Sequence, residues 1–218
     1  MNIPKNHFIV EVEKAYEDTV NINGKEMFIN VTFDPLKLAR QYGVVKHAPN
    51  WLPEGLEFDV KEGDKIYFHH LITGNQASMT IDRKVKAQHS SIDLVSDNKI
   101  NWIEGEENLY KVHWEHIYAR VRDGELKMVH HWNFIEQKIE AEEDVKTKSG
   151  IYIKSTQDDI TLYGYIRHMN SWLKDQGMKE GDEIVFSENS EYEMTIEGEK
   201  LLRMRNQDIL ALFDNERK

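Results

Sequence analysis

Short stretches in which apolar and polar residues alternate recur along the chain and predict β-strands. Residues 8–12 place a phenylalanine and two valines at every second position, which is the spacing of a strand with one buried face. Residues 66–68 and 184–186 are short β-branched and aromatic runs, and each closely follows a turn-forming Gly-Asp pair. These segments therefore predict short, half-buried strands.

A hairpin is predicted near the end of the chain. Residues 191–197 alternate polar and apolar side chains, Gly198 provides a turn, and a second apolar run occupies residues 201–204. Only residues 36–42 and 206–210 resemble helical turns. Many short strands separated by turns are typical of small barrels, because closure removes exposed sheet edges. The pattern predicts an all-β chain.

Four blocks of sequence occur twice in the same order, which indicates an internal duplication. The copies differ by an insertion at about residues 73–108, and the polar stretch at residues 122–125 contains an Asp-Gly pair suited to a boundary. We therefore expect one domain at residues 1–125 and a second at residues 126–218. The matching blocks are residues 8–9 with 134–135, 42–47 with 163–168, 60–68 with 178–186, and 109–121 with 201–213.

Composition and charge exclude several classes of function. The chain of 218 residues contains no cysteine, so disulfides, thiol nucleophiles and cysteine zinc sites are excluded and a reducing compartment is expected. The net charge is −11, and both halves are acidic, which argues against nucleic acid and anionic membranes as partners. No apolar run is long enough to span a bilayer, and the first residues do not resemble a signal peptide.

The second copy carries two motifs that resemble the chaperonin-10, or GroES, family of co-chaperonins. Residues 180–186 (EGDEIVF), a hairpin, and residues 200–213 (KLLRMRNQDILALF) are similar to the closing pattern of the family. Residues 143–153 (EDVKTKSGIYI) resemble its mobile loop, in which a Thr/Ser/Gly-rich stretch leads into an apolar tripeptide. The internal repeat extends the resemblance to most of the first copy.

The resemblance implies two tandem GroES-like irregular β-barrels and a non-enzymatic function. Members of the family assemble into rings through their terminal strands and cap a GroEL-type chaperonin ring when nucleotide is present, assisting protein folding. We therefore expect a homo-oligomeric ring, a chaperonin partner, no cofactor, and a cytoplasmic location (the host cytoplasm if the source is a virus). A scaffold protein that uses the same barrel only for assembly is the alternative.

The resemblance assigns chaperonin binding to Gly150, Ile151, Tyr152 and Ile153. These residues are flanked by Lys, Ser and Thr, which favour a solvated, flexible loop. A core strand is the competing interpretation of the same run. In the first copy, Met27, Phe28 and Ile29 occupy the corresponding place, but a hairpin turning at Asn23-Gly24 explains their pattern as well.

The tryptophans and histidines of the chain also have structural interpretations that involve no functional site. Trp51 and Trp172 lie where the family has its roof hairpin, and they either line the chamber or a ring interface, or pack within their own unit. The adjacent pairs His69-His70 and His130-His131 are poor chelators if they lie in strands, because neighbouring residues then face opposite sides. His113 and His116 are expected at a strand end and in a turn. No catalytic motif or phosphate-binding loop is present.

Overall fold

The chain divides into two compact units, Met1–His130 and His131–Lys218. Each unit contains a six-stranded antiparallel sheet and a separate two-stranded ribbon. The structure is a computed structural model, and it describes residues 6–16, 19–22, 24–28, 38–54, 58–73, 103, 108–138, 145–146, 152–153, 162–188, 190 and 192–213.

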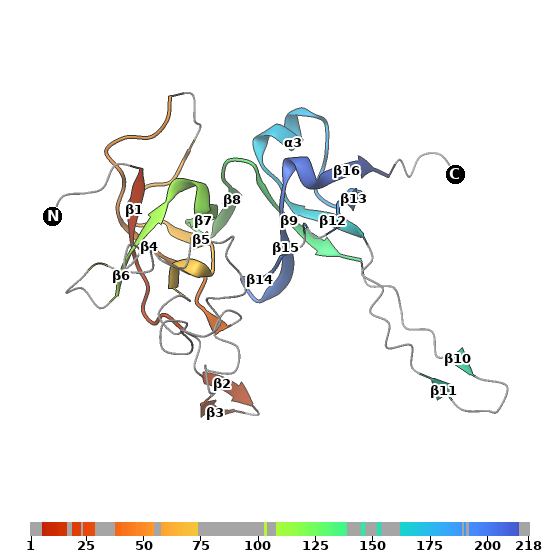
Figure 1. The fold of residues 1–218 in the computed structure, drawn as a ribbon, viewed down its shortest axis with the longest axis horizontal. Coiled ribbons are helices and arrows are strands. Elements are labelled where there is room, and N and C mark those ends of the chain that lie inside the picture. Colours follow the sequence, from red (N-terminus) through yellow and green to blue (C-terminus); the bar gives the residue numbers. More distant parts are fainter. Residues whose placement is uncertain are drawn as a thin grey trace, which may run out of the picture. The chain divides into compact units, whose positions relative to one another are not determined.

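The sheet of the first unit has the strand order β6-β1-β4-β5-β7-β8, and its ribbon pairs β2 with β3 (Figure 1). All of these pairs are antiparallel. The strands are β1 (His7–Glu11), β2 (Thr19–Ile22), β3 (Lys25–Phe28), β4 (Tyr42–His47), β5 (Lys65–Phe68), β6 (Leu109–His113), β7 (Ile117–Arg122) and β8 (Glu125–Met128), and the 3-10 helix η3 (Trp114–His116) joins β6 to β7.

The sheet of the second unit has the order β14-β15-β9-β12-β13-β16, and its ribbon pairs β10 with β11. The strands are β9 (Trp132–Gln137), β10 (Val145–Lys146), β11 (Tyr152–Ile153), β12 (Tyr163–His168), β13 (Glu183–Phe186), β14 (Glu193–Ile196), β15 (Glu199–Arg205) and β16 (Ile209–Leu212), with the helix α3 (Ser171–Asp175) after β12 and the 3-10 helix η4 (Asn206–Asp208) before β16.

Five strands of one sheet correspond to five strands of the other in the same order. The run β6-β1-β4-β5-β7 matches β15-β9-β12-β13-β16, and it follows the matching blocks of sequence. The turns that lead into β5 and β13 are also alike: Asp64 Oδ2 accepts a hydrogen bond from Lys61 N, and Asp182 Oδ2 accepts one from Lys179 N, each at 2.8 Å. The same local chemistry therefore starts the same strand in both units.

Alternation of side chains produces the core of each unit. On β14, Met194 and Ile196 are buried while their neighbours are exposed, as expected for a strand with one solvated face. Each unit has its own cluster of buried apolar side chains. Prominent members are Phe8, Val10, Ile66, Phe68, Val112 and Ile117 in the first unit, and Ile135, Ile166, Leu173, Ile184, Phe186 and Met204 in the second.

The sheets confirm the all-β class expected from the sequence, and β14 with β15 confirms the hairpin. Two details differ from expectation. Residues 171–175 form the helix α3 instead of a roof hairpin. The first unit extends to His130, beyond the expected boundary at residue 125, because β8 pairs with β7 and so belongs to the first sheet. Among the described residues, no helix is long and apolar enough to cross a membrane.

Candidate functional site: apolar ribbons between the first two strands of each core

A two-stranded ribbon lies between corresponding strands of the two cores. β2 and β3 come between β1 and β4, whereas β10 and β11 come between β9 and β12. Each ribbon pairs only with itself in the described part of the chain, and neither joins a six-stranded sheet. The residues with predicted chaperonin contacts belong to these two ribbons or to the segments beside them.

The ribbon of the first unit contains two of the three predicted residues. Met27 and Phe28 lie on β3, opposite Val20 and Thr19 of β2, and Ile29 falls outside the described residues. The hairpin turns at Gly24, whose φ of 80° is readily adopted by glycine. The Met27 side chain is 52% exposed. A thioether with this exposure on a narrow ribbon is accessible to an apolar groove on a partner.

The ribbon of the second unit contains the other candidate residues. Tyr152 pairs with Lys146, and Ile153 pairs with Val145. Gly150 and Ile151 lie outside the described residues. Since β11 pairs with β10 and with no strand of the six-stranded sheet, Tyr152 and Ile153 do not occupy a strand of the main core in the described chain. Their role in binding a chaperonin stays a prediction.

The two tryptophans at the expected roof positions are both about half exposed. Trp51 is 49% exposed and Trp172 is 51% exposed, so neither is buried in the core of its own unit. Trp172 belongs to α3, where its neighbour Leu173 is fully buried. Leu173 anchors this short helix in the core, while the adjacent Trp172 stays half exposed.

A network of buried amides holds α3 on its sheet. Asn170 caps the helix, because its Oδ1 accepts a hydrogen bond from Leu173 N at 3.1 Å. The side chains of Asn133 and Asn170 both donate to Asn206 Oδ1, at 2.8 and 2.7 Å. Asn133 and Asn170 are almost completely buried, so these bonds satisfy groups that would otherwise be costly to bury.

Several histidines of the first unit lie close together. The adjacent pairs were expected to lie in strands, and they do not. His69 and His70 follow β5 and lie outside any strand, and their rings stack at 4.3 Å. His130 and His131 likewise lie between β8 and β9. His113 at the end of β6 and His116 in η3 occupy the expected positions, with ring centroids 6.0 Å apart. Within the described ranges, no three His, Asp or Glu side chains are arranged to hold a metal ion.

Three histidines make the fold sensitive to acid. Burial lowers the pKa of His113, His130 and His168 below the ordinary value of 6.5. The nearby His7 lowers the pKa of His113 further, while Glu115 opposes the shift at His113 and at His130. The folded chain therefore binds fewer protons than the unfolded chain just below pH 6.5.

We expect the free energy of unfolding to fall as the pH drops from 7.5 to 5.5. The measurement is the midpoint of urea unfolding at both pH values, for wild type and for His113→Asn. The midpoint of the wild type should be lower at pH 5.5 than at pH 7.5. The midpoint of the variant should fall by less, because it lacks the His113 imidazole with its lowered pKa. An unchanged or higher midpoint at pH 5.5 would contradict this assignment.

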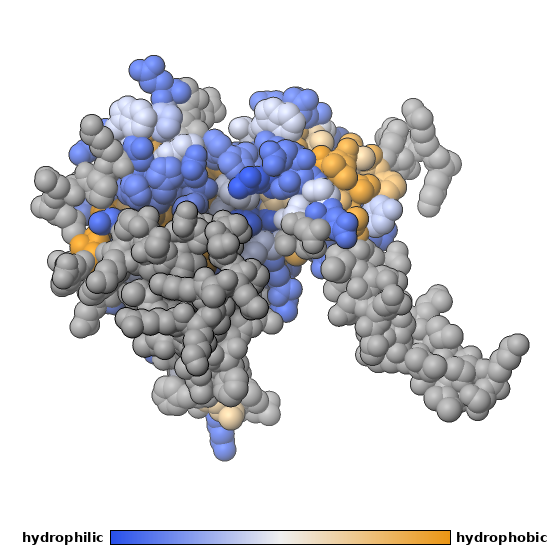
Figure 2. Space-filling model, in the orientation of Figure 1, coloured by the Kyte–Doolittle hydropathy of each residue, from blue (hydrophilic) through white to orange (hydrophobic). Residues whose placement is uncertain are grey.

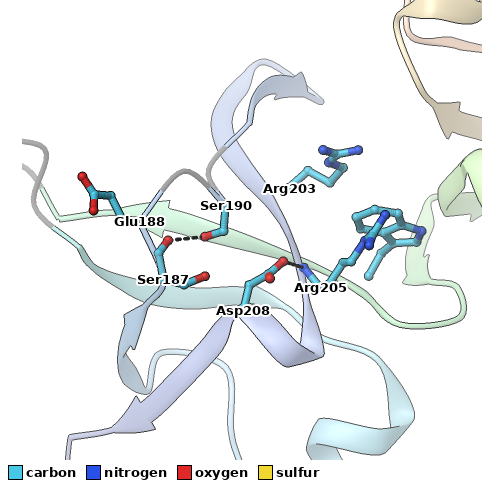
Figure 3. A pocket seen from close by; sticks show the side chains of 7 residues that line it. Ser187, Glu188, Ser190, Arg203, Arg205 and Asp208 are labelled. Atoms are coloured by element: carbon cyan, nitrogen blue, oxygen red, sulfur yellow. Dashed lines mark hydrogen bonds between the residues drawn. The ribbon is translucent and has the colours of Figure 1, made fainter. Parts of the chain in front are cut away.

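A polar hollow of about 230 Å³ lies in the second unit, and sequence reasoning missed it (Figure 3). Arg203 and Arg205 project from β15, and their guanidinium carbons lie 4.6 and 5.0 Å from the Trp132 ring centroid. Side chains of both charge signs line the hollow, so it has no marked preference for an anion. The lining residues are Trp132, Ser187, Glu188, Ser190, Arg203, Arg205 and Asp208.

Comparison with known proteins identifies the family of the chain. The family model described as the chaperonin 10 kDa subunit matches residues 125–213. Co-chaperonin GroES of Rhodothermus marinus is 33% identical over 78 residues, which cover 33% of this chain and 78% of the relative. Co-chaperonin GroES of Dinoroseobacter shibae is 31% identical over 93 residues, covering 39% and 88%. The corresponding protein of Chlorobium luteolum is 33% identical over 75 residues, covering 31% and 79%.

The chain belongs to the chaperonin 10 family of co-chaperonins. The matched region begins at β8 and includes the whole sheet of the second unit. The first unit before β8 lies outside the matched residues, yet five of its strands have the same order as those of the second unit. Membership of the family supports a co-chaperonin role for the chain.

Proposed function

We propose that the protein is a non-enzymatic co-chaperonin that caps a GroEL-type chaperonin ring in a nucleotide-dependent manner. Its ribbons carry the contacts: Gly150–Ile153 in the second unit and Met27–Ile29 in the first. The observation that carries the proposal is the place of these apolar residues on or beside ribbons that pair outside both main sheets. Binding of a partner to the ribbons therefore displaces no strand of either six-stranded sheet.

The expected energetics favour reversible docking. Burying one large apolar side chain on a partner contributes about 1.5–3 kcal/mol. Ordering the bound segment offsets much of that gain, so a single ribbon binds weakly. A homo-oligomeric ring presents several ribbons at once and raises their effective concentration, which makes capping firm yet reversible. This role needs neither a catalytic group nor a cofactor.

The test is co-elution with a GroEL-type ring on a sizing column, with and without ATP. Wild type is compared with Tyr152→Asp, Met27→Asp and the control Trp172→Asp. Met27 and Trp172 are matched in exposure, at 52% and 51%, so the control introduces the same charge at an equally exposed apolar position. We expect wild type and the control to join the ring only with nucleotide.

Tyr152→Asp should lose co-elution, because an aspartate is costly to bury in an apolar groove. Met27→Asp reports separately on the first unit: loss of binding would show that both ribbons dock, and retention would restrict docking to the second. If wild type joins no ring under any condition, the co-chaperonin proposal is wrong, and a scaffold that uses the sheets only for assembly replaces it.

A further inference from the structure

Two imidazoles of the first unit cap turns by accepting backbone hydrogen bonds. His69 Nδ1 accepts from Leu71 N at 3.1 Å, at the start of the helical turn at residues 71–73. His113 Nδ1 accepts from Glu115 N at 3.5 Å and so caps η3. An imidazole nitrogen accepts a hydrogen bond only while it carries no proton. Both caps therefore require the neutral form of these histidines.

The two capped turns belong to one connected region of the first unit. His69 N donates to His116 O in η3 at 3.1 Å, and Ile72 N donates to His69 O at 3.0 Å. Ile72 is 4% exposed, and the buried Thr73 donates its hydroxyl proton to Arg40 O at 2.6 Å. Loss of the caps would therefore loosen side chains that pack in the core.

Several titratable rings surround the His69 imidazole. It stacks on the His70 ring at 4.3 Å and lies 5.9 Å from the His116 ring, measured between ring centroids. The Tyr118 ring of β7 lies 6.4 Å away at its edge. The His116 ring in turn lies 6.0 Å from that of His113. Positive charges gained by these imidazoles would repel one another.

The surroundings of His113 hold groups that act in opposite directions. The His7 ring of β1 lies 5.0 Å away, and the Glu115 carboxylate has Oε2 at 3.5 Å from His113 Nδ1. His130, after β8, contacts the other side of this region through the Trp114 ring, at 5.1 Å. Burial and His7 lower the pKa of His113 more than Glu115 raises it, so the neutral, capping form is favoured at neutral pH.

The second unit makes the same backbone connection without a histidine. Ser187 N donates to Asp208 O at 2.8 Å, as His69 N does to His116 O in the first unit. η4 is closed by a carboxylate, because Asp208 Oδ2 accepts a hydrogen bond from Arg205 N at 3.2 Å. The turns of the two units are therefore equivalent in position but differ in the chemistry of their acceptors.

The strands that follow the two 3-10 helices also differ. Ile117, the first residue of β7 after η3, is completely buried. β16 follows η4 and exposes Leu210 and Leu212 by 63% and 44%, and Figure 2 shows apolar residues gathered at this end of the second unit. Movement of η3 therefore reaches a packed core strand directly.

We propose that residues 69–73 and η3 form an acid-operated switch, which opens this part of the first unit as the pH falls below about 6 while the equivalent turns of the second unit stay closed. Protonation converts Nδ1 of His69 and of His113 from an acceptor into a donor, so the backbone N–H groups of Leu71 and Glu115 lose their acceptors. The open form binds more protons, so its population rises as the pH falls. The switch goes beyond chaperonin capping and does not depend on it.

Hydrogen exchange followed by mass spectrometry tests the switch on the full chain at pH 7.5 and 5.5, with labelling times scaled for the intrinsic pH dependence of exchange. An imidazole released by an open turn has a pKa of about 6.5, so each cap should open up to about tenfold more often at pH 5.5. Peptides spanning residues 68–73 and 113–117 should lose protection at pH 5.5. Peptides spanning residues 186–190 and 205–209 should keep theirs.

Asparagine variants separate the two caps from general effects of acid. Asparagine Oδ1 accepts a hydrogen bond from the backbone N–H two residues further on, and the amide does not titrate. His69→Asn/His113→Asn should therefore keep its protection at both pH values. The control His47→Asn removes a histidine of β4 whose side chain is 47% exposed, and it should respond as wild type does.

The proposal would be overturned by unchanged protection of the first-unit peptides in wild type, by an equal loss in the second-unit peptides, or by a double asparagine variant that still responds to pH. If the double variant does not fold at pH 7.5, the comparison of the two units within wild type decides the question. Co-elution with a chaperonin is measured separately, so failure of the switch leaves the capping proposal intact.

Discussion

Replacing Asp59 by alanine is expected to lower the free energy of unfolding of the first unit by about 3 kcal/mol, because it leaves a buried cation without its counter-ion. The Arg120 side chain is 3% exposed, and its Nη2 donates to Asp59 Oδ2 at 2.7 Å. Arg120 Nε donates to the Asp59 backbone carbonyl at 2.9 Å, whereas Nη1 has no acceptor in the described part of the chain. In the described part of the chain, Asp59 supplies the carboxylate that pairs with this guanidinium.

The lowered pKa values of Asp59 and Asp64 agree with strong ion pairs between these carboxylates and the neighbouring arginines. The hydrogen bond from Arg120 lowers the pKa of Asp59, and Arg122 lowers it further against the effect of burial. Burial raises the pKa of Asp64, but the hydrogen bonds from Arg122 and from Lys61 N outweigh it, and the net shift is downward. Both carboxylates therefore stay ionised at pH 5.5, where the histidine effect is measured, and their contribution is lost only at lower pH.

The measurement is urea unfolding of Asp59→Ala, Arg120→Met, the double variant, and the exposed control Glu62→Ala. Arg120→Met should lower the free energy of unfolding by less than Asp59→Ala does, because it removes the buried charge together with its requirement for a partner. The corresponding position of the second unit is Leu212, so an apolar side chain is compatible with this strand. The double variant should be more stable than Asp59→Ala, and the control should change stability by less than about 1 kcal/mol. A double variant less stable than Asp59→Ala would refute the explanation.

Replacing Gly164 by alanine is expected to destabilise the second unit by about 3 kcal/mol, the upper part of the range for overpacking. A Cβ at this position would lie 2.7 Å from Glu136 O and 2.6 Å from Ile135 Cγ2. The carbonyl belongs to β9, which pairs with β12, so the contact is relieved only by separating two central strands. Gly43 has the same constraint in the first unit, with Glu11 O at 2.5 Å.

Gly177→Ala separates this steric effect from backbone strain. Gly177 has a φ of 84°, but nothing lies within 4 Å of the position of its Cβ. Alanine at this position should lower the free energy of unfolding by about 1 kcal/mol, because only the strain of a positive φ opposes it. Thermal unfolding should therefore rank Gly43→Ala and Gly164→Ala as clearly more destabilising than Gly177→Ala. Equal costs at the three positions would show that close strand packing is not the cause.

Local patterns were sufficient to predict much of the fold. The alternation before and after Gly198 predicted the hairpin of β14 and β15, because side chains that alternate between core and solvent specify a strand directly. The repeated block containing Gly-Asp predicted equivalent turns, and Asp64 and Asp182 form the same hydrogen bond there. The positions of η3 and η4 also followed from the repeat.

Local patterns failed where distant residues decide the conformation. α3 forms because Asn170 caps it and because Asn133 and Asn206, from other parts of the chain, satisfy the same amide network. The stacking of His69 on His70 depends on the chain leaving the strand at Phe68, which the assumed strand geometry did not include. No local signal in Arg203 or Arg205 indicated that both would stack on Trp132 of another strand.

The sequence by itself determined the all-β class, the family, the acidic and cysteine-free character of the chain, and the apolar residues proposed to contact a chaperonin. These depend on composition, on short-range alternation and on motifs, all of which are written along the chain. Only the tertiary structure decided which strand edges are filled. β7 and β16 have similar sequences, yet Tyr118 is buried and Leu210 is exposed, because burial depends on whether a neighbouring segment returns to pair with the strand.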